Sequence, residues 1–587
     1  MTELRPRYHW VVPPAHPLSA ATIEEARRRG LSARALRVLS RRGPVDLAEL
    51  AARFDEPGAG LHDPGSLPDA EIVQARIDRA RRTGESVLVL GDFDADGLTG
   101  LAILAEALRW LGVMAEPYVP HRTSEGHGLS MAAVARAREA GHTLIITADT
   151  GSTSLTEVAA ARQAGIDVIV TDHHVLGSQL PDAVALVNLQ RPDSHYPDRR
   201  LSGAGVAFKV AQLLMGGQPG GAAAALELAD LAAIGSVADV VPIAGENRAI
   251  VRLGLRQLAR APRPGLAALL AAARLDTDDL STEDIAFGLA PRINAMGRIG
   301  DPSIAAALLL ARDEGEAAGL AAQLEAANLQ RRDMTTAAMT DARASLQTTM
   351  GDEATPGDAF IVLQGDWPVG IIGLVAGRLA EETGRPVLVL SSAVTPWRGS
   401  ARSAGGVDVA AALEACRDLL ERHGGHPAAA GCHVEAGYVP ELRIRLADFA
   451  ASQPPSDPRP TLAIDLVQSA VDTDYVLLRE LAPLEDAAEA PPLVGVAGLV
   501  VVRARVASGG HTQLTLRRGR DVVDGISFGR ADLAEQLTEG LEIDVVARLT
   551  SRTFAGLETL QLEVRDVAAA GALGGLMAAA ASGRVKP

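Results

Sequence analysis

Residues 86–97 read SVLVLGDFDADG, an apolar run followed at once by three aspartates at alternate positions and a closing glycine. Further strand-like runs recur downstream, each preceded by a helical pattern, and they cover residues 116–119, 143–147 and 167–171. Apolar strands that alternate with amphipathic helices are typical of a parallel sheet covered on both faces. The sequence therefore predicts an α/β fold whose chemistry lies at the carboxyl ends of the strands.

Acidic and imidazole side chains follow these strands. A fourth apolar run, at 231–237, is predicted as a further strand with an aspartate at its end. The side chains at the four strand ends are Asp92, Asp94 and Asp96, then Asp149, then Asp172, His173 and His174, and finally Asp239. One aspartate at such a position is usually a helix cap. Helix capping alone does not explain why all four predicted strand ends carry carboxylates or histidines, so these side chains are candidates for a common site.

The mixture of ligand types indicates the chemistry. A calcium loop would need a glutamate a few residues after the aspartates, and residues 98–104 contain none. Carboxylate oxygens favour Mg²⁺ and Mn²⁺, while imidazole shifts the preference towards Mn²⁺. Two such ions could activate a water and stabilise both the attacking and the leaving oxygen at a phosphorus atom. The pattern thus predicts phosphoester hydrolysis with Mn²⁺ or Mg²⁺, on two ions.

Together with the aspartate-rich loop and residues 235–239, the Asp172-His173-His174 triplet resembles the DHH phosphoesterase superfamily. Further stretches are similar to its RecJ family of exonucleases, which degrade single-stranded DNA from the 5′ end, and they cover residues 61–64, 120–122, 125–128 and 291–298. Residues 399–403 and 424–431 are similar to the DHHA1 domain of this superfamily. The resemblance implies release of nucleoside 5′-monophosphates in DNA repair and recombination.

The resemblance also implies roles for individual residues. The metal ligands would be Asp94, Asp96, Asp149, His173 and Asp239, with His174 at the second metal or acting on the scissile phosphate, and Asp92 as a weaker catalytic assignment. The residues that grip the DNA strand would be Arg122, Arg298, Ser400, Arg402, Gly425 and His426. The chain departs from the family pattern at Thr150, where asparagine is usual, and at Pro368, where histidine is common. Because proline replaces the family's histidine at position 368, any role of that histidine in the family is not expected in this chain.

Changes in composition along the chain predict its domains. They are an N-terminal segment at 1–70 that resembles a lid or appendage, a DHH catalytic domain at 71–304, a connecting helix at 305–350, a smaller α/β DHHA1 domain at 351–452, an OB-fold barrel at 461–567 and a tail at 568–587. Arginines in the barrel could form a track for a single strand. A barrel that only stiffens the protein is the alternative.

Composition limits the class of protein. Hydrophobic residues make up 47% of the chain and charged residues 22%, which excludes global disorder. The net charge of −17 means that a binding site for DNA must be a local basic groove. The two cysteines exclude a disulfide framework, and no long uninterrupted apolar run is present, so we expect a soluble, cytoplasmic protein with no membrane contact.

Single-stranded DNA is the expected partner, and the chain is expected to be a monomer. A helicase and a single-strand-binding protein are possible further partners. Two other functions remain open. One is a DHH phosphodiesterase of short oligoribonucleotides or cyclic dinucleotides, which would not need the N-terminal segment or the barrel. The other is a non-catalytic scaffold, which the full set of carboxylates and histidines argues against.

Overall fold

The computed structural model describes residues 4–121, 125–260, 262–350, 359–404, 406–453, 459–554 and 557–576. The chain divides into two units. The first, here called the catalytic unit, comprises residues 48–334 with 487–489, and the second comprises residues 1–47, 335–486 and 490–587. Both contain the β-structure that the sequence predicts, so the α/β class and the C-terminal barrel are confirmed.

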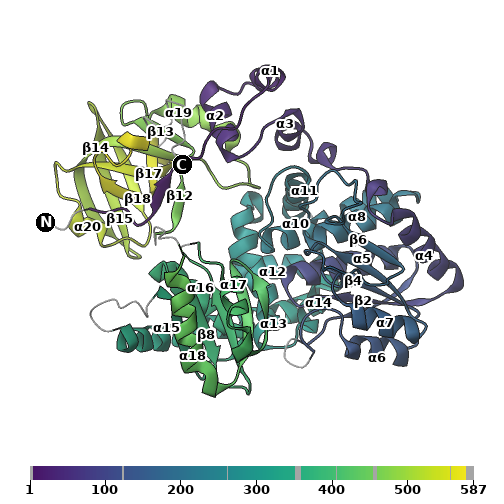
Figure 1. The fold of residues 1–587 in the computed structure, drawn as a ribbon. Helices are drawn as coiled ribbons and strands as arrows, with labels where there is room; N and C mark the ends of the chain where they lie inside the picture. Colours follow the sequence, from purple (N-terminus) through teal and green to yellow (C-terminus); the bar gives the residue numbers. More distant parts are fainter. Residues whose placement is uncertain are drawn as a thin grey trace. The chain divides into compact units, whose positions relative to one another are not determined.

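The catalytic unit is built on a five-stranded sheet with the order β3-β2-β4-β5-β6, in which all pairs are parallel (Figure 1). The strands are β2 (Ser86–Gly91), β3 (Met114–Tyr118), β4 (Leu144–Ala148), β5 (Asp167–Asp172) and β6 (Ala185–Asn188). In the register of the sheet, Gly91 pairs with Ala148 and Ala148 with Thr171. The carboxyl ends of β2, β4 and β5 are therefore level with one another.

Alternate residues of β2 pack on opposite faces of the sheet, as the pleat of a strand requires. Val87 and Val89 belong to the larger core, whereas Leu88 and Leu90 belong to a second, smaller core. The helices of the larger core include α4 (Ala70–Thr83), α5 (Ala95–Trp110), α8 (Gly203–Gly216) and α10 (Ala229–Ala238). The other face is covered by α6 (Met131–Glu139) and α7 (Leu155–Gln163). Burial of β2 on both faces explains its continuous apolar sequence.

The apolar run at 231–237 is not a strand, and this part of the sequence interpretation is wrong. It lies inside helix α10, and Asp239 follows the last residue of that helix. Every residue from Ala229 to Val237 is buried. A helix that is buried on all sides has no polar stripe, so its sequence looks like that of a buried strand.

The catalytic unit has further helices before and after the sheet. They are α3 (Leu47–Phe54), whose first residue belongs to the other unit, α9 (Gly221–Leu226), α11 (Glu246–Arg260), α12 (Pro264–Ala273), a π-helical turn at Asp284–Leu289, α13 (Ala290–Ile299), α14 (Ser303–Leu310) and α15 (Glu314–Met350), of which residues 335–350 belong to the other unit. The region predicted as one connecting helix is thus two helices. Asp313 accepts a hydrogen bond from the amide of Glu316 at 2.8 Å, so α15 begins with its own cap.

The second unit contains a mixed five-stranded sheet with the order β10-β11-β9-β8-β7, in which only β7 and β8 are parallel. Its strands are β7 (Ile361–Gly365), β8 (Val387–Ser391), β9 (Trp397–Arg402), β10 (Leu420–His426) and β11 (Ala429–Val434). Its helices are α16 (Val369–Thr383), α17 (Val409–Glu414) and α18 (Val439–Ala451).

A barrel follows. Its strands are β14 (Leu493–Ala507), β15 (His511–Arg518), β16 (Asp521–Ser527), β17 (Glu542–Phe554) and β18 (Leu557–Ala569), with β13 (Leu466–Ser469) added beside β14 and the helices α19 (Tyr475–Leu481) and α20 (Leu533–Gln536). Because β14 pairs with both β15 and β17, the five long strands close on themselves. A closed barrel leaves no free edge among these strands.

The N-terminal residues pack with this barrel. They form β1 (His9–Val11), α1 (Ala20–Arg28) and α2 (Ala33–Arg42), and β1 pairs in parallel with β12 (Thr461–Ala463). The indole nitrogen of Trp10 donates a buried hydrogen bond to Asp566 in β18 at 2.8 Å. Arg42 forms an ion pair with Asp465 at 2.8 Å. Residues 4–47 are therefore tied to the barrel.

Among the described residues, one helical stretch, Gly221–Ala238, is long and apolar enough to cross a membrane, and 61% of it is buried inside the protein. Its buried apolar residues belong to the larger core of the catalytic unit. A core helix of a soluble protein has these properties.

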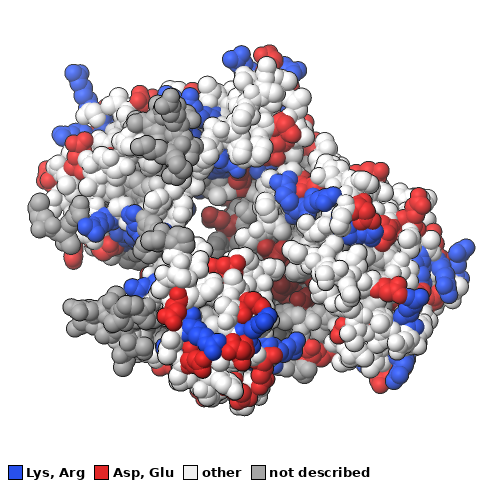
Figure 2. Space-filling view, viewed as in Figure 1, with Lys and Arg blue, Asp and Glu red and all other residues white. Residues whose placement is uncertain are grey.

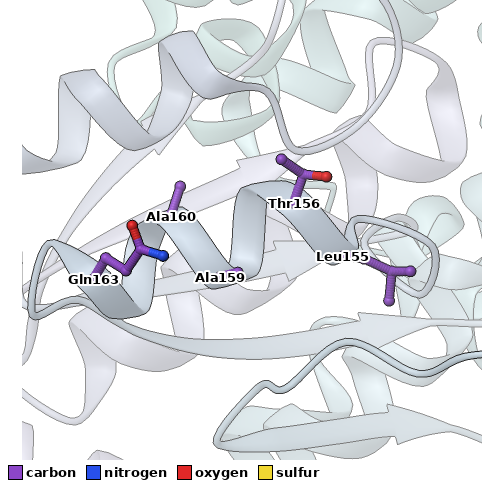
Figure 3. Close-up of a pocket in the computed structure, with 5 residues that line it drawn as sticks. All are labelled: Leu155, Thr156, Ala159, Ala160 and Gln163. Atoms are coloured by element: carbon purple, nitrogen blue, oxygen red, sulfur yellow. The ribbon is translucent and has the colours of Figure 1, made fainter.

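A shallow depression on the outer surface of α7 is lined by Leu155, Thr156, Ala159, Ala160 and Gln163 (Figure 3). None of these residues was predicted to be functional.

Candidate metal centre

Side chains that directly follow β4, β5 and α10, together with one from the first turn of α5, meet at the carboxyl ends of the strands of the catalytic sheet. His173 Nε2 lies 3.1 Å from Asp149 Oδ1, 3.6 Å from Asp239 Oδ2 and 3.9 Å from Asp96 Oδ2. His174 Nδ1 lies 3.7 Å from Asp149 Oδ1. Two groups of potential ligands result, Asp149 with His173 and His174, and Asp96 with His173 and Asp239, each within 4.8 Å. The two groups share His173 and therefore lie next to each other in one cluster.

Two atoms in this cluster are buried without a hydrogen-bond partner, namely Asp149 Oδ1 and His173 Nε2. Buried polar atoms nearly always have a partner, so atoms without one need an explanation. Both atoms are good ligands for Mn²⁺ and, in the case of the carboxylate, for Mg²⁺. The donor set therefore fits a divalent cation.

The electrostatics of the cluster also favour a cation. Burial, together with the charges of Asp92 and Asp96, raises the pKa of Asp94 to about 6. Burial and the charge of Asp96 raise the pKa of Asp239 to about 7, and the same causes raise the pKa of Asp149 well above its usual value. The carboxylates thus destabilise one another in their charged forms, and a divalent ion would offset this repulsion.

Asp96 is held by the start of a neighbouring helix. Its carboxylate accepts hydrogen bonds from the amides of Gly203 at 2.7 Å and Ala204 at 2.9 Å, which are the first residues of α8. The positive end of a helix stabilises a negative charge at this position. A Cβ at Gly235 would lie 2.6 Å from Asp96 Oδ1, so only glycine allows α10 to approach this carboxylate.

Asp172 was not assigned a role from the sequence, and the structure gives it one. Its Oδ1 lies 2.8 Å from His174 Nδ1 and accepts hydrogen bonds from the amides of His173 and His174, while its Oδ2 accepts one from the amide of Ser152. This hydrogen bond between Asp172 and the His174 ring raises the pKa of His174 to about 9. Although burial opposes it, the same bond lowers the pKa of Asp172 to about 2. Asp172 therefore orients His174.

Asp92 and Asp94 lie in the loop after β2, but neither belongs to the two ligand groups found among the described residues. Asp94 Oδ1 accepts the amide of Gly97 at 3.0 Å and so caps α5, whereas Asp92 Oδ2 lies 3.5 Å from His127 Nδ1. Asn294 also supports this loop, because its Oδ1 accepts the amide of Ala95 at 2.7 Å. The similarity of residues 291–298 to RecJ indicated that α13 matters, but it did not predict the hydrogen bond from Ala95 to Asn294.

The residues predicted to grip DNA fall into three groups. Ser400 and Arg402 lie on β9, and Gly425 and His426 lie on β10, with β11 between them, so four of the six lie level with one another at the carboxyl ends of these two strands. Arg402 Nη1 donates to Ser400 Oγ at 2.9 Å. Arg298 lies in the last turn of α13 in the catalytic unit, and Arg122 is outside the described residues.

The arginines of the barrel are partly engaged within the protein. Arg548 pairs with Glu485 at 3.3 Å, Arg518 donates to the carbonyl of Thr473, and Arg505 donates to Gln513. On the face that Figure 2 shows, basic and acidic side chains are intermixed. These contacts weaken the hypothesis of a continuous basic track along the barrel.

Comparison with protein families defines the class. The DHH family N-terminal domain matches residues 86–236, the DHHA1 domain matches residues 357–452 and the RecJ OB domain matches residues 477–566. The matched DHH region ends shortly before Asp239 and contains the other residues of the metal cluster. A DHH phosphoesterase with DHHA1 and OB domains is thereby defined.

The chain belongs to the RecJ family. It is 36% identical over 539 residues to the single-stranded-DNA-specific exonuclease RecJ of Bacillus subtilis (strain 168), covering 90% of this chain and 67% of that protein. The RecJ of Thermus thermophilus is 33% identical over 496 residues, covering 84% and 70%. The crystal structure of the T. thermophilus RecJ in complex with Mn²⁺ matches with a TM-score of 0.79 at 30% identity, covering 96% of this chain and 79% of that one. A complex with Mg²⁺ matches with a TM-score of 0.75.

Proposed function

We propose that this protein is a metal-dependent exonuclease that hydrolyses phosphodiester bonds in single-stranded DNA. The observation that carries the proposal is the pair of ligand groups that share His173, with two buried ligand atoms that lack a partner. Membership of the RecJ family supplies the substrate class, since the family members named above are exonucleases specific for single-stranded DNA. Mn²⁺ or Mg²⁺ is the cofactor that this donor set suits.

The residues of the two groups would hold two ions. Asp149 lies close to both histidines, and Asp96 and Asp239 lie close to His173, so these five residues would hold the ions. When bound, such ions activate a water and stabilise the oxygens around the phosphorus. We place Asp94 at the edge of the site, where its cap on α5 orients the loop that carries Asp96.

The protein's own residues position the strand and the histidines. Asp172 orients His174 through the hydrogen bond between its Oδ1 and Nδ1 of the imidazole ring. Ser400, Arg402, Gly425 and His426 present a hydroxyl, a guanidinium, a glycine and an imidazole on two strands separated by β11, which suits contact with a phosphate backbone. We assign Arg298 and Arg122 the same role. Hydrolysis from the 5′ end to nucleoside 5′-monophosphates, and a role in DNA repair and recombination in the cytoplasm, complete the proposal.

A time course on single- and double-stranded oligonucleotides labelled at the 5′ or the 3′ end tests this function. With Mn²⁺ or Mg²⁺, mononucleotides carrying the 5′ label should appear first from the single strand, and EDTA should stop the reaction. Release of the 3′ label first would reverse the proposed polarity. Equal rates on blunt duplex would contradict single-strand specificity, and cleavage confined to oligomers of a few nucleotides would favour the small-substrate phosphodiesterase. We also propose that the protein is a monomer and that a helicase and a single-strand-binding protein are its partners. Light scattering tests the first proposal, and pull-down with purified proteins tests the second.

A further inference from the structure

Val240 has a backbone conformation that branched residues rarely adopt. It follows Asp239 directly after helix α10, and its φ is 60°. Its amide donates to the carbonyl of Val237 at 3.2 Å, so the residue ends the helix in a left-handed conformation. Glycine or asparagine usually occupies this position, because a Cβ crowds the neighbouring carbonyl and a β-branched side chain crowds it further. The backbone alone would therefore favour glycine here.

Packing of the Val240 side chain does not offset this backbone strain. It is 85% exposed, more than any other large hydrophobic residue that the structure describes. An apolar side chain held in water contributes nothing to folding through the hydrophobic effect. Neither local conformation nor core packing explains the valine. Strain of this kind is concentrated at functional sites, so its location decides what it means.

That location is the metal centre. Asp239 Oδ2 lies 3.6 Å from His173 Nε2, and the Cα of Val240 is one peptide unit, about 3.8 Å, from that of Asp239. A second exposed valine occupies the same kind of position, because Val175 directly follows His174 and is 73% exposed. Two branched apolar side chains thus follow two residues of the cluster and point into solvent.

We propose that Val240 contacts the substrate, packing its isopropyl group against the sugar and base of the nucleotide whose phosphate lies at the metal centre, with Val175 as a second apolar contact. The inference rests on the proposed function. An isopropyl group has no hydrogen-bond donor or acceptor, so it contacts any of the four nucleosides without reading the base. Such a contact holds the terminal nucleotide in place independently of sequence, as an exonuclease needs.

The structure provides a matched control for the test. Arg274 caps helix α12 in the same left-handed conformation, with a φ of 57°, and its side chain is exposed. Replacement by glycine relieves the backbone in both Val240→Gly and Arg274→Gly. We expect each variant to raise the midpoint of thermal unfolding by about 1 to 3 °C. Only Val240→Gly removes the proposed contact with the nucleotide.

The two variants should differ in their handling of DNA. For Val240→Gly we expect the KM for a 5′-phosphorylated single strand to rise about three- to tenfold, with a smaller change in kcat, as partial loss of a buried valine contact predicts. Arg274→Gly should leave both unchanged. Val240→Ala should raise the KM without the full gain in stability, and Val240→Ile should stay close to the original protein. Affinity for Mn²⁺, measured by calorimetry, should not change in any of these variants.

Several results would overturn the proposal. An unchanged KM in Val240→Gly would show that the side chain makes no contact that matters. A loss of Mn²⁺ affinity in this variant would show that Val240 serves only to place Asp239. Fluorescence anisotropy with a labelled single strand in EDTA separates this inference from the proposed function. If the unaltered protein binds the strand in EDTA but hydrolyses nothing when Mn²⁺ is supplied, the proposed function fails, whereas equal binding by Val240→Gly in EDTA would refute the contact.

Discussion

His174 Nδ1 lies 2.8 Å from Oδ1 of Asp172, and the same carboxylate oxygen accepts the amides of both histidines that follow it. The first residue of the triplet is therefore not one of the ligands in the cluster but the group that fixes the position of the two ligands after it. This relationship makes the triplet a single unit in which a carboxylate orients histidines, as is common around metal-binding imidazoles.

Asp172→Ala should lower kcat about 10- to 100-fold, since loss of a carboxylate that orients a metal-binding histidine has an effect of this size. Steady-state rates at saturating Mn²⁺ measure it, and far-ultraviolet circular dichroism checks that the variant folds. Asp193→Ala removes an exposed aspartate that pairs with Arg191 and should leave the rate unchanged. A rate for Asp172→Ala equal to that of this control would contradict the orienting role.

Asp149→Asn should abolish turnover, because the amide removes the charge of a ligand that lies close to both histidines. In EDTA the same variant should unfold at a higher temperature than the original protein at pH 8. Burial and the charge of Asp96 raise the pKa of Asp149 above its value in the unfolded chain, so at a pH well above that ordinary value folding disfavours the charged form, and the substitution relieves the cost of burial and repulsion. Differential scanning calorimetry with and without Mn²⁺ measures both effects. A lower midpoint in EDTA would show that this repulsion is absent.

Arg402→Ala and Arg298→Ala should weaken binding of a single strand and reduce the slope of log K against log salt by about 0.7 each, because each removes one phosphate contact. Single-turnover rates at saturating DNA should change much less than the affinity. Arg256→Ala provides the control, since Arg256 is an exposed arginine that pairs with Glu56. If the slopes of all three variants equal that of the original protein, neither arginine contacts phosphate.

Lys209→Met should lower the free energy of unfolding of the catalytic unit by about 3 to 5 kcal/mol, as is typical when one partner of a buried ion pair is removed. Lys209 Nζ lies 3.0 Å from Glu246 Oε1, and neither side chain has any exposed surface. Glu246 also accepts hydrogen bonds from the amide of His62 and the hydroxyl of Tyr196. Urea denaturation measures the loss. In the double variant Lys209→Met/Glu246→Gln the loss should be smaller than the sum of the two single losses, and a strictly additive result would argue against coupling.

The sequence by itself determined the α/β class, the succession of β2 to β5 with the helices between them, and the five residues that the structure brings together in the two ligand groups. Local periodicity suffices for the first two, because a strand buried on both faces must be apolar throughout. The aspartates and histidines could be recognised because they follow strands whose carboxyl ends meet at one edge of a parallel sheet. The stretches similar to RecJ added the DHHA1 and OB domains.

Only the tertiary structure decided how several of these residues act. Asp239 reaches the cluster from the end of a helix, since a fully buried helix and a buried strand have the same apolar sequence. The pairing of β1 with β12 joins residues that lie far apart in the chain, and no local pattern encodes such a contact. Likewise, the role of Asp172, the support from Asn294 and the left-handed conformation of Val240 depend on distances and dihedral angles that form only when the chain is folded.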